Sequence, residues 1–309
     1  MVPKENTHLF FSHGLLEDLP GDELLRELSW NIDAYYLGAV LPDSFYYSAE
    51  GAVASISAFI HGKDGNPTNT LIFEVLDRAP RGADLALILG FITHCALDIV
   101  FHPVIYYLSG NYYDPDPENR SRATYWHRHL ETGLDIALGN TLRMHALVRP
   151  HVLKGLIFEG LVSRHFNVTG SRIRGTIRKQ VLLNRVFESR RLYRLARLLL
   201  RREFILTDPA LLGLFYADVK HPCANLEQRF SYQDPVSGED LETSVFALMR
   251  RARTLAADMM EAAHLYARGR IPRDVLADRI PGLSLDTGRM NTPSSTIRYT
   301  AQSTHPEPC

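Results

Sequence analysis

The residues best suited to chemistry lie in one short stretch, GFITHCALDIVFHP, from Gly90 to Pro103. His94, Asp98 and His102 recur there every four residues, so in a helix their side chains would form one narrow polar stripe. The neighbouring residues are apolar, which predicts that the stripe is buried. Buried polar groups need partners, and a bound metal ion would supply them. The alternative is a pair of core histidines that hydrogen-bond a buried aspartate.

A second pair of metal-ligand residues follows in the segment TYWHRHLETGLD. His127 and Glu131 are again four residues apart, so one turn of helix would let both bind the same ion. Asp135 lies another four residues on and is a candidate for a further ligand or a supporting partner. His129 would point away from this face. Two such clusters in one chain favour a metal site over hydrogen-bonded core histidines.

Three further candidates come from the first 61 residues. His8 lies in an expected helix over Thr7–Leu19, and His13 on another face of that helix is the alternative ligand. Asp43 follows a glycine and a proline in LGAVLPDSFYY, where a role as turn-former is the competing interpretation. His61 stands beside a glycine-rich loop, a usual place to display ligands.

The elements that must position these residues are almost all helices. Gly38 and Pro42 are expected to break regular structure before Asp43, and Pro103 is expected to end the central helix. Strand-like alternation is nearly absent, which predicts an all-α, compact multi-helix bundle. Helices are expected over Thr7–Leu19, Asp22–Tyr36, Asn69–Leu76, Ala83–Phe101, Arg120–Met144, Pro150–Phe166, Ser171–Phe204, Thr207–Asp218 and Leu241–Ala267.

We expect one helical domain over residues 1–285. The metal-binding part would cover about 1–148, and a helical extension about 149–285. Residues 286–309 are rich in Thr, Ser and Pro and lack apolar periodicity, so they are expected to form a disordered tail.

Composition narrows the class of protein. A hydrophobic content of 45% and a charged content of 22% over 309 residues are typical of a soluble globular protein. The net charge of −1 argues against a wholesale nucleic-acid binder. Neither a secretory signal nor an uninterrupted apolar run of roughly 20 residues is apparent. Three widely separated cysteines fit a reducing compartment, so a cytoplasmic location is expected.

The expected helix over Ser171–Phe204 is strongly basic, with eleven Arg and Lys residues opposed by only Glu188 and Glu203. It also keeps an apolar stripe. A basic amphipathic helix can rest on an anionic membrane or follow phosphates. The plainer interpretation is a solvated helix face.

Taken together, the first half of the chain resembles the zinc-dependent phospholipase C family, whose scaffold is shared by fungal single-strand nucleases. The resemblance rests on the order His, Asp, His, His-x3-Asp, His, His-x3-Glu. It is carried by the segments THLFFSH, GAVLPDSFYY, FIHG, HCALD, FHP and HRHLE. The candidate ligands are His8, Asp43, His61, His94, Asp98, His102, His127 and Glu131.

The resemblance implies an all-helical fold with a cluster of two or three zinc ions at the base of a cleft. Asp43, His61, His94 and Asp98 would hold one zinc, and His102, His127 and Glu131 a second. His8, chosen over His13 from the resemblance alone, would bind a third, with Asp98 bridging to it. Asp43 would also be the general base, or would orient the attacking water. Mixed His and carboxylate ligands suit zinc, although ligand type alone leaves manganese and iron open.

The sequence therefore predicts a zinc-dependent hydrolase of the phospholipase C type, in which a metal-activated water attacks a phosphodiester of a lipid-like or small substrate. Phe45, Tyr46 and Tyr47 could meet a cationic head group, or could simply pack in the core. One alternative is a metal-dependent nuclease. Another is a non-catalytic helical scaffold, stapled by metal, that binds a partner or a membrane surface.

Overall fold

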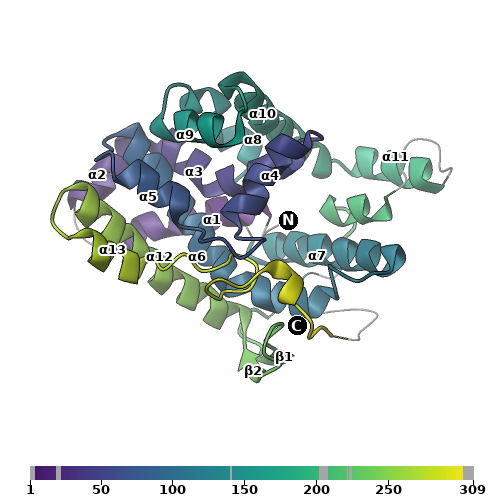
Figure 1. The fold of residues 1–309 in the computed structure, drawn as a ribbon. Coiled ribbons are helices and arrows are strands. Elements are labelled where there is room, and N and C mark those ends of the chain that lie inside the picture. Colours follow the sequence, from purple (N-terminus) through teal and green to yellow (C-terminus); the bar gives the residue numbers. More distant parts are fainter. Residues whose placement is uncertain are drawn as a thin grey trace.

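The structure is a computed structural model that describes residues 4–18, 22–139, 141–201, 208–220, 222 and 225–301. As predicted, the fold is all-α. Helices pack around one central helix, and the only sheet within the described ranges is a two-stranded antiparallel hairpin (Figure 1). The main apolar core extends from Leu9 near the start of the chain to Leu285.

The helices of the metal-ligand half are α1 (Glu5–Asp18), α2 (Asp22–Trp30), α3 (Ile32–Ser44), α4 (Gly51–Ile60), α5 (Thr70–Leu76), α6 (Ala83–Ser109) and α7 (Pro117–Ala137). They are followed by α8 (Met144–Leu147), α9 (Ile157–Phe166), α10 (Gly170–Phe187), α11 (Arg190–Arg201), α12 (Val245–Ala267) and α13 (Arg273–Arg279). Short 3-10 helices are η1 (Phe45–Tyr47), η2 (Pro150–Leu153), η3 (Pro209–Leu214) and η4 (Ser294–Thr296), and the strands are β1 (Phe230–Gln233) and β2 (Asp240–Thr243).

Helix α6 is the centre of the bundle and packs mainly against α3 and α12. By length and mean hydropathy it is the one helix of the described chain that could cross a membrane. The sequence argued against a membrane span, because polar residues interrupt the apolar run. Every residue of its most apolar window is buried inside the fold, as in the core helix of a globular protein.

The crossing of α3 and α6 depends on two glycines. A Cβ atom on Gly38 would lie 2.0 Å from the carbonyl oxygen of Leu87, and one on Gly90 would lie 2.0 Å from that of Tyr35. Only glycine at both positions lets the two backbones approach this closely. The contact fixes the end of α3, which carries Asp43, against the middle of α6.

The prolines do not end helices as the sequence suggested. Pro42 lies inside α3, so Asp43 is a helical residue and not part of a turn, and Pro103 lies inside α6. A proline in a helix costs roughly 3 kcal/mol. Burying one Leu- or Phe-sized side chain stabilises the fold by about 1.5 to 3 kcal/mol. Because nearly all side chains of α6 are buried, this stabilisation exceeds the cost of the proline.

The basic segment forms two helices instead of one. It breaks at Glu188 and Ser189, where the Ser189 hydroxyl accepts a hydrogen bond from the backbone N–H of Leu192 at 3.3 Å and caps α11. Helix α11 stands out from the bundle and contacts η3 and α10 (Figure 1). Residues 202–207 of the expected helices lie outside the described residues.

The structure also contains a hairpin that helix-based analysis missed. The sequence DPVSGE joins β1 and β2, and Asp234 accepts hydrogen bonds from the N–H groups of Val236 and Ser237 at 2.9 and 2.8 Å. Gly238 adopts a positive φ of 75°, as such turns require.

The expected disordered tail is wrong for residues 286–301. This segment packs on the bundle, with Asp286, Ser294 and Ile297 buried and the N–H of Ala301 bonded to the carbonyl of Tyr107 at 2.7 Å. Short-range periodicity could not reveal it, because its contacts are with elements far away in the chain. Residues 302–309 lie outside the described residues.

Candidate metal centre

Eight buried side chains form three groups whose ligand atoms lie close enough to hold metal ions. They come from α1, the end of α3, the residue after α4, the middle of α6, and α7. The groups are His8 with His94 and Asp98; Asp43 with His61 and His94; and His102 with His127 and Glu131. The structure thus brings together all eight residues predicted as ligands.

Asp98 stands between the groups. Its Oδ2 atom lies 2.9 Å from Nε2 of His94 and 3.7 Å from Nε2 of His61. Its Oδ1 atom lies 3.4 Å from Nε2 of His8 and 4.0 Å from Nε2 of His102. One carboxylate therefore faces histidines of all three groups and could be shared by ions that these groups would hold.

Backbone carbonyls fix the orientation of two histidine rings. Nδ1 of His61 lies 2.7 Å from the carbonyl oxygen of Ser57, and Nδ1 of His94 lies 2.9 Å from that of Ala39. A carbonyl can only accept, so each Nδ1 carries the proton and each Nε2 presents a lone pair to the cluster. Metal-binding histidines are commonly held in this way.

The third group is enclosed by aromatic rings. Nε2 of His127 lies 2.9 Å from Oε1 of Glu131. The rings of Tyr106 and Tyr112 lie 4.9 and 5.2 Å from the His127 ring, centroid to centroid. The Tyr46 ring lies 5.3 Å from the ring of His61, which belongs to the second group. Tyr46 and Tyr112 are only partly buried, whereas all eight candidate ligands are buried.

Asp286 is a functional candidate that sequence analysis missed. Its Oδ1 atom lies 3.4 Å from Nδ1 of His102, and its Oδ2 atom accepts a hydrogen bond from the hydroxyl of Ser294 at 2.5 Å. Burial opposes ionisation of Asp286, but the hydrogen bond and charge of His102 hold the pKa of its carboxyl well below the usual value. An Asp at the edge of a Thr/Ser/Pro-rich segment gave no local signal of this contact.

The donor set fits divalent zinc. Among the described residues, Nε2 of His61, His94 and His102, Oδ1 of Asp43, Oε1 of Glu131 and both oxygens of Asp98 have no hydrogen-bond partner. Burial raises the pKa of Asp98 and Glu131 well above the usual value and lowers the pKa of His94, so without a cation the cluster resists charge. A divalent cation would reverse that balance, and imidazole and carboxylate are the ligand types that zinc binds.

Other residues considered from the sequence lie elsewhere. His13 is exposed, with Nδ1 at 2.7 Å from the hydroxyl of Tyr36, while His8 is in the cluster. His129 is partly buried outside the three groups, and its Nδ1 atom lies 3.1 Å from Oδ2 of Asp218. Asp135 contacts Thr7 and Tyr216, beside the cluster but outside the three groups. Of the three aromatics, Phe45 is core and Tyr47 bonds Glu5, which leaves Tyr46 near the cluster.

Comparison with known proteins identifies the family. Searches of curated proteins and of solved structures return no match. The sequence model of the zinc dependent phospholipase C family matches residues 7–167, which is slightly more than half of the 309 residues and includes all eight candidate ligands. The chain therefore belongs to the zinc-dependent phospholipase C family.

Proposed function

We propose that this protein is a zinc-dependent phosphoric-ester hydrolase that cleaves a phosphodiester in a phospholipid-like substrate. The observation that carries the proposal is the bridging position of Asp98 between three buried ligand groups. Membership of the family supports a zinc-dependent hydrolase, and the choice of a phosphodiester follows from a cluster able to hold two or three cations close together.

The proposed roles follow from position. Asp43, His61, His94 and Asp98 would hold one zinc, His102, His127 and Glu131 a second, and His8 with Asp98 a third. When bound, the ions would lower the pKa of water to about 7 and stabilise negative charge on the phosphoryl group. Asp43 Oδ1 lies 3.2 Å from Nε2 of His61, so its carboxylate is held at the cluster, where it would orient the attacking water and accept its proton.

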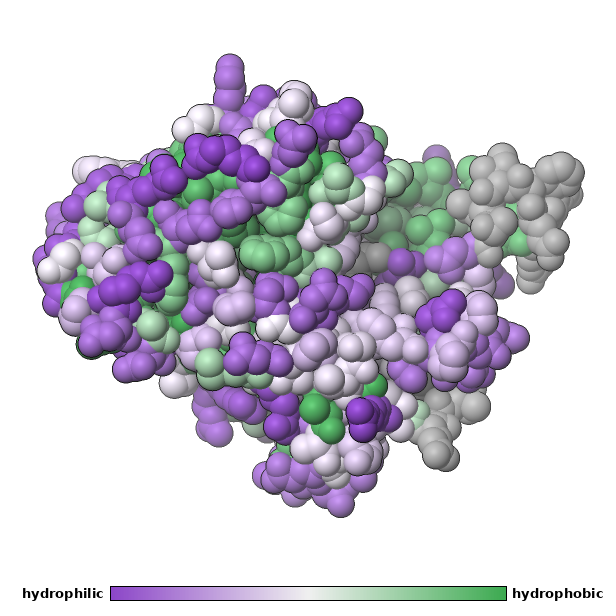
Figure 2. Space-filling model, viewed as in Figure 1, coloured by the Kyte–Doolittle hydropathy of each residue, from purple (hydrophilic) through white to green (hydrophobic). Residues whose placement is uncertain are grey.

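A membrane surface is the proposed location of the substrate. On α11, Leu192, Leu195 and Leu198 are 39%, 49% and 48% exposed, and arginines occupy the adjoining face. Apolar side chains are visible at the base of the protruding lobe where Figure 1 places α11 (Figure 2). Exposed leucines beside arginines match an anionic lipid surface, with its apolar interior and negative headgroups. A cytoplasmic location stays a prediction from the sequence.

The test is hydrolysis by zinc-loaded protein. Vesicles of phosphatidylcholine, vesicles containing phosphatidylglycerol, bis-p-nitrophenyl phosphate and single-stranded DNA would be offered in parallel. We expect zinc-dependent release of the lipid headgroup, lost on chelation and in Asp43→Asn but kept in His13→Ala, which removes an exposed histidine of α1. Absence of any phosphodiester cleavage by protein with bound zinc would contradict the proposal.

The same experiment separates the alternatives. A nuclease would cleave single-stranded DNA and leave vesicles intact. A metal-stapled scaffold would lose thermal stability on chelation and show no cleavage at all. Changing Leu192, Leu195 and Leu198 to Gln tests the membrane contact, since it should reduce cosedimentation with anionic vesicles and leave cleavage of the soluble diester unchanged.

A further inference from the structure

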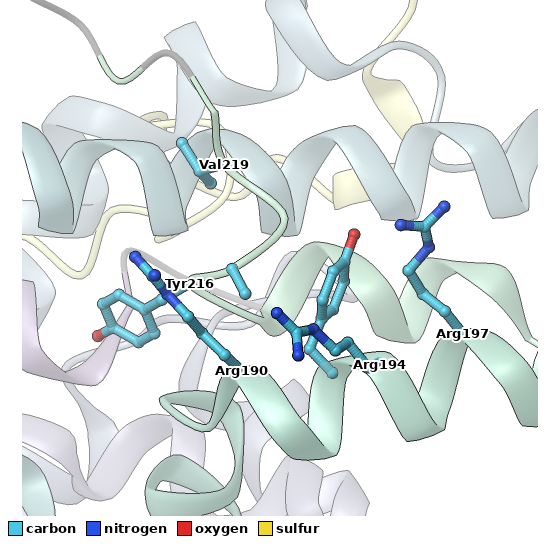
Figure 3. Close-up of a pocket in the computed structure, with 7 residues that line it drawn as sticks. Arg190, Arg194, Arg197, Tyr216 and Val219 are labelled. Carbon is cyan, nitrogen blue, oxygen red and sulfur yellow. The ribbon is translucent and has the colours of Figure 1, made fainter.

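A cavity of about 320 Å³ opens between α11 and the segment that follows η3. Its lining is basic and aromatic and comprises Arg190, Tyr193, Arg194, Arg197, Tyr216, Ala217 and Val219. The three arginines leave α11 on the side that faces the Tyr216–Val219 segment (Figure 3). A cavity of this size accommodates a small ligand or one end of a larger one.

The arginines of the pocket concentrate positive charge. They occupy positions i, i+4 and i+7 of one helix, so their guanidinium groups share a face and repel one another. No carboxylate of the described chain lies within ion-pair distance of Arg190, Arg194 or Arg197, although arginines elsewhere in the fold have such partners. An anion in the cavity would relieve the repulsion, and guanidinium groups match phosphate oxygens in geometry.

The aromatic side of the pocket is held rigidly. The Tyr193 hydroxyl donates to Oδ1 of Asp218 at 2.6 Å, and Asp218 also accepts from Tyr125 of α7 at 2.6 Å. The Asp218 carboxylate lies between α11 and α7, with one oxygen bonded to each helix, and Asp218 is not among the lining residues. The pocket wall is thereby tied to the helix that carries His127 and Glu131.

Tyr216 connects the pocket with the metal centre. Its hydroxyl accepts a hydrogen bond from Asn6 at 2.6 Å and donates one to Asp135. Asn6 is two residues from His8, and Asp135 is four residues after Glu131, a rise of about 6 Å along α7. Tyr216 therefore contacts α1 about half a turn before His8 and α7 about one turn after Glu131.

We propose that the pocket formed by Arg190, Arg194, Arg197, Tyr193 and Tyr216 is an anion subsite, which binds a second phosphate on the headgroup of the substrate. This inference rests on the proposed function and narrows the substrate class. The preferred lipid carries an additional phosphate besides the scissile diester, because a cationic headgroup would meet three arginines there.

The first test is direct binding of inorganic phosphate to zinc-loaded protein, measured by isothermal titration calorimetry. Changing Arg190, Arg194 and Arg197 together to Gln should weaken the binding of phosphate to the pocket, called arginine-dependent binding below, at least tenfold. A matched control changes Arg178, Lys179 and Arg185 to Gln, since these exposed residues of α10 carry the same charge outside the pocket. His127→Ala damages the metal centre and should keep the arginine-dependent binding. Equal binding by the pocket triple variant and its control would overturn the proposal.

The second test compares two short-chain lipids dispersed in detergent, which removes any attraction to a vesicle surface. Phosphatidylinositol 4-phosphate carries the second phosphate and phosphatidylcholine does not. The pocket triple variant should raise KM for the first at least tenfold and leave KM for the second within twofold. Equal effects on both lipids would overturn the anion subsite even if hydrolysis is confirmed. Arginine-dependent phosphate binding without hydrolysis of either lipid would support the subsite and refute the proposed function.

Discussion

Oδ1 of Asp286 lies 3.4 Å from Nδ1 of His102, and this contact joins the last described segment of the chain to the middle of α6. The other ring nitrogen of His102 faces Asp98, Nε2 to Oδ1 at 4.0 Å. A carboxylate on the far side of a ligand histidine fixes its ring orientation and increases its basicity. We therefore treat Asp286 as a positioning residue for the metal centre.

Replacing Asp286 by Asn should weaken zinc binding by about 10- to 100-fold, because the amide has no charge to support His102. Competition with a chromogenic chelator measures the affinity. Asp240→Asn, which removes an exposed carboxylate of the hairpin, is the control and should bind zinc as the wild type does. Unchanged affinity in Asp286→Asn would show that His102 is held without it.

Removing zinc should destabilise the fold, because the unpaired polar atoms of the cluster are then buried without partners. A ligand at 100 times its Kd stabilises by about 2.7 kcal/mol, so a fall of several degrees in Tm is expected on chelation. Readdition of zinc should restore the original Tm. A Tm that does not respond to chelator or zinc would speak against a metal at this cluster.

Gly90→Ala should destabilise the protein by more than about 3 kcal/mol, because the new Cβ would collide with the backbone of α3. Gly175→Ala is the matched control. It lies in α10 with nothing within 4 Å of the added atom, so it should stabilise by up to about 1 kcal/mol. Urea unfolding of the two variants measures the difference, and similar effects from both would refute the close crossing of α3 and α6.

Lys4 should make stability depend on pH in the alkaline range. Burial lowers its pKa from 10.5 to about 8, against opposing charges from Asp135 and Glu5. The folded state therefore binds fewer protons than the unfolded state between pH 8 and 10.5, and stability contributed by this site rises with pH across that window. The rise relative to Lys4→Met should be about 3 kcal/mol at most.

Unfolding of the wild type and Lys4→Met in urea at pH 7, 8, 9 and 10 tests this expectation. Lys179→Met, which removes an exposed lysine of α10, controls for the loss of one positive charge. A constant difference in unfolding free energy between wild type and Lys4→Met over this range would show that burial of the protonated Lys4 amine does not destabilise the fold.

The candidate ligands of α6 and α7 could be predicted from the sequence because their spacing of four matches a helical turn, whereas the choice of His8 rested on the resemblance to a family. His94, Asp98 and His102 needed no tertiary information to fall on one face of α6. Which element brought Asp43 to that face was not predictable. It depends on the close approach of α3 and α6 at Gly38 and Gly90, and a glycine or proline that permits close packing has the same local signature as one that breaks a helix.

The contribution of the C-terminal region escaped sequence analysis for a related reason. Asp286 and Ser294 act through contacts with α6 and with each other, and the surrounding residues lack regular periodicity. The pocket arginines were visible as a basic run, but their common cavity depends on the break at Ser189 and on the return of the chain past Tyr216. Only the three-dimensional arrangement shows that these arginines line one cavity and are not simply part of a solvated helix face.

Metal content, measured by inductively coupled plasma mass spectrometry on protein purified without a metal-affinity tag, would show whether the buried His and carboxylate groups hold zinc. We predict two or three zinc ions per chain in the wild type and in His13→Ala. His127→Ala should lose one equivalent, and His94→Ala should lose at least one other. A wild-type protein that contains no zinc and takes none up on titration would contradict the account, as would single variants that leave the zinc content unchanged.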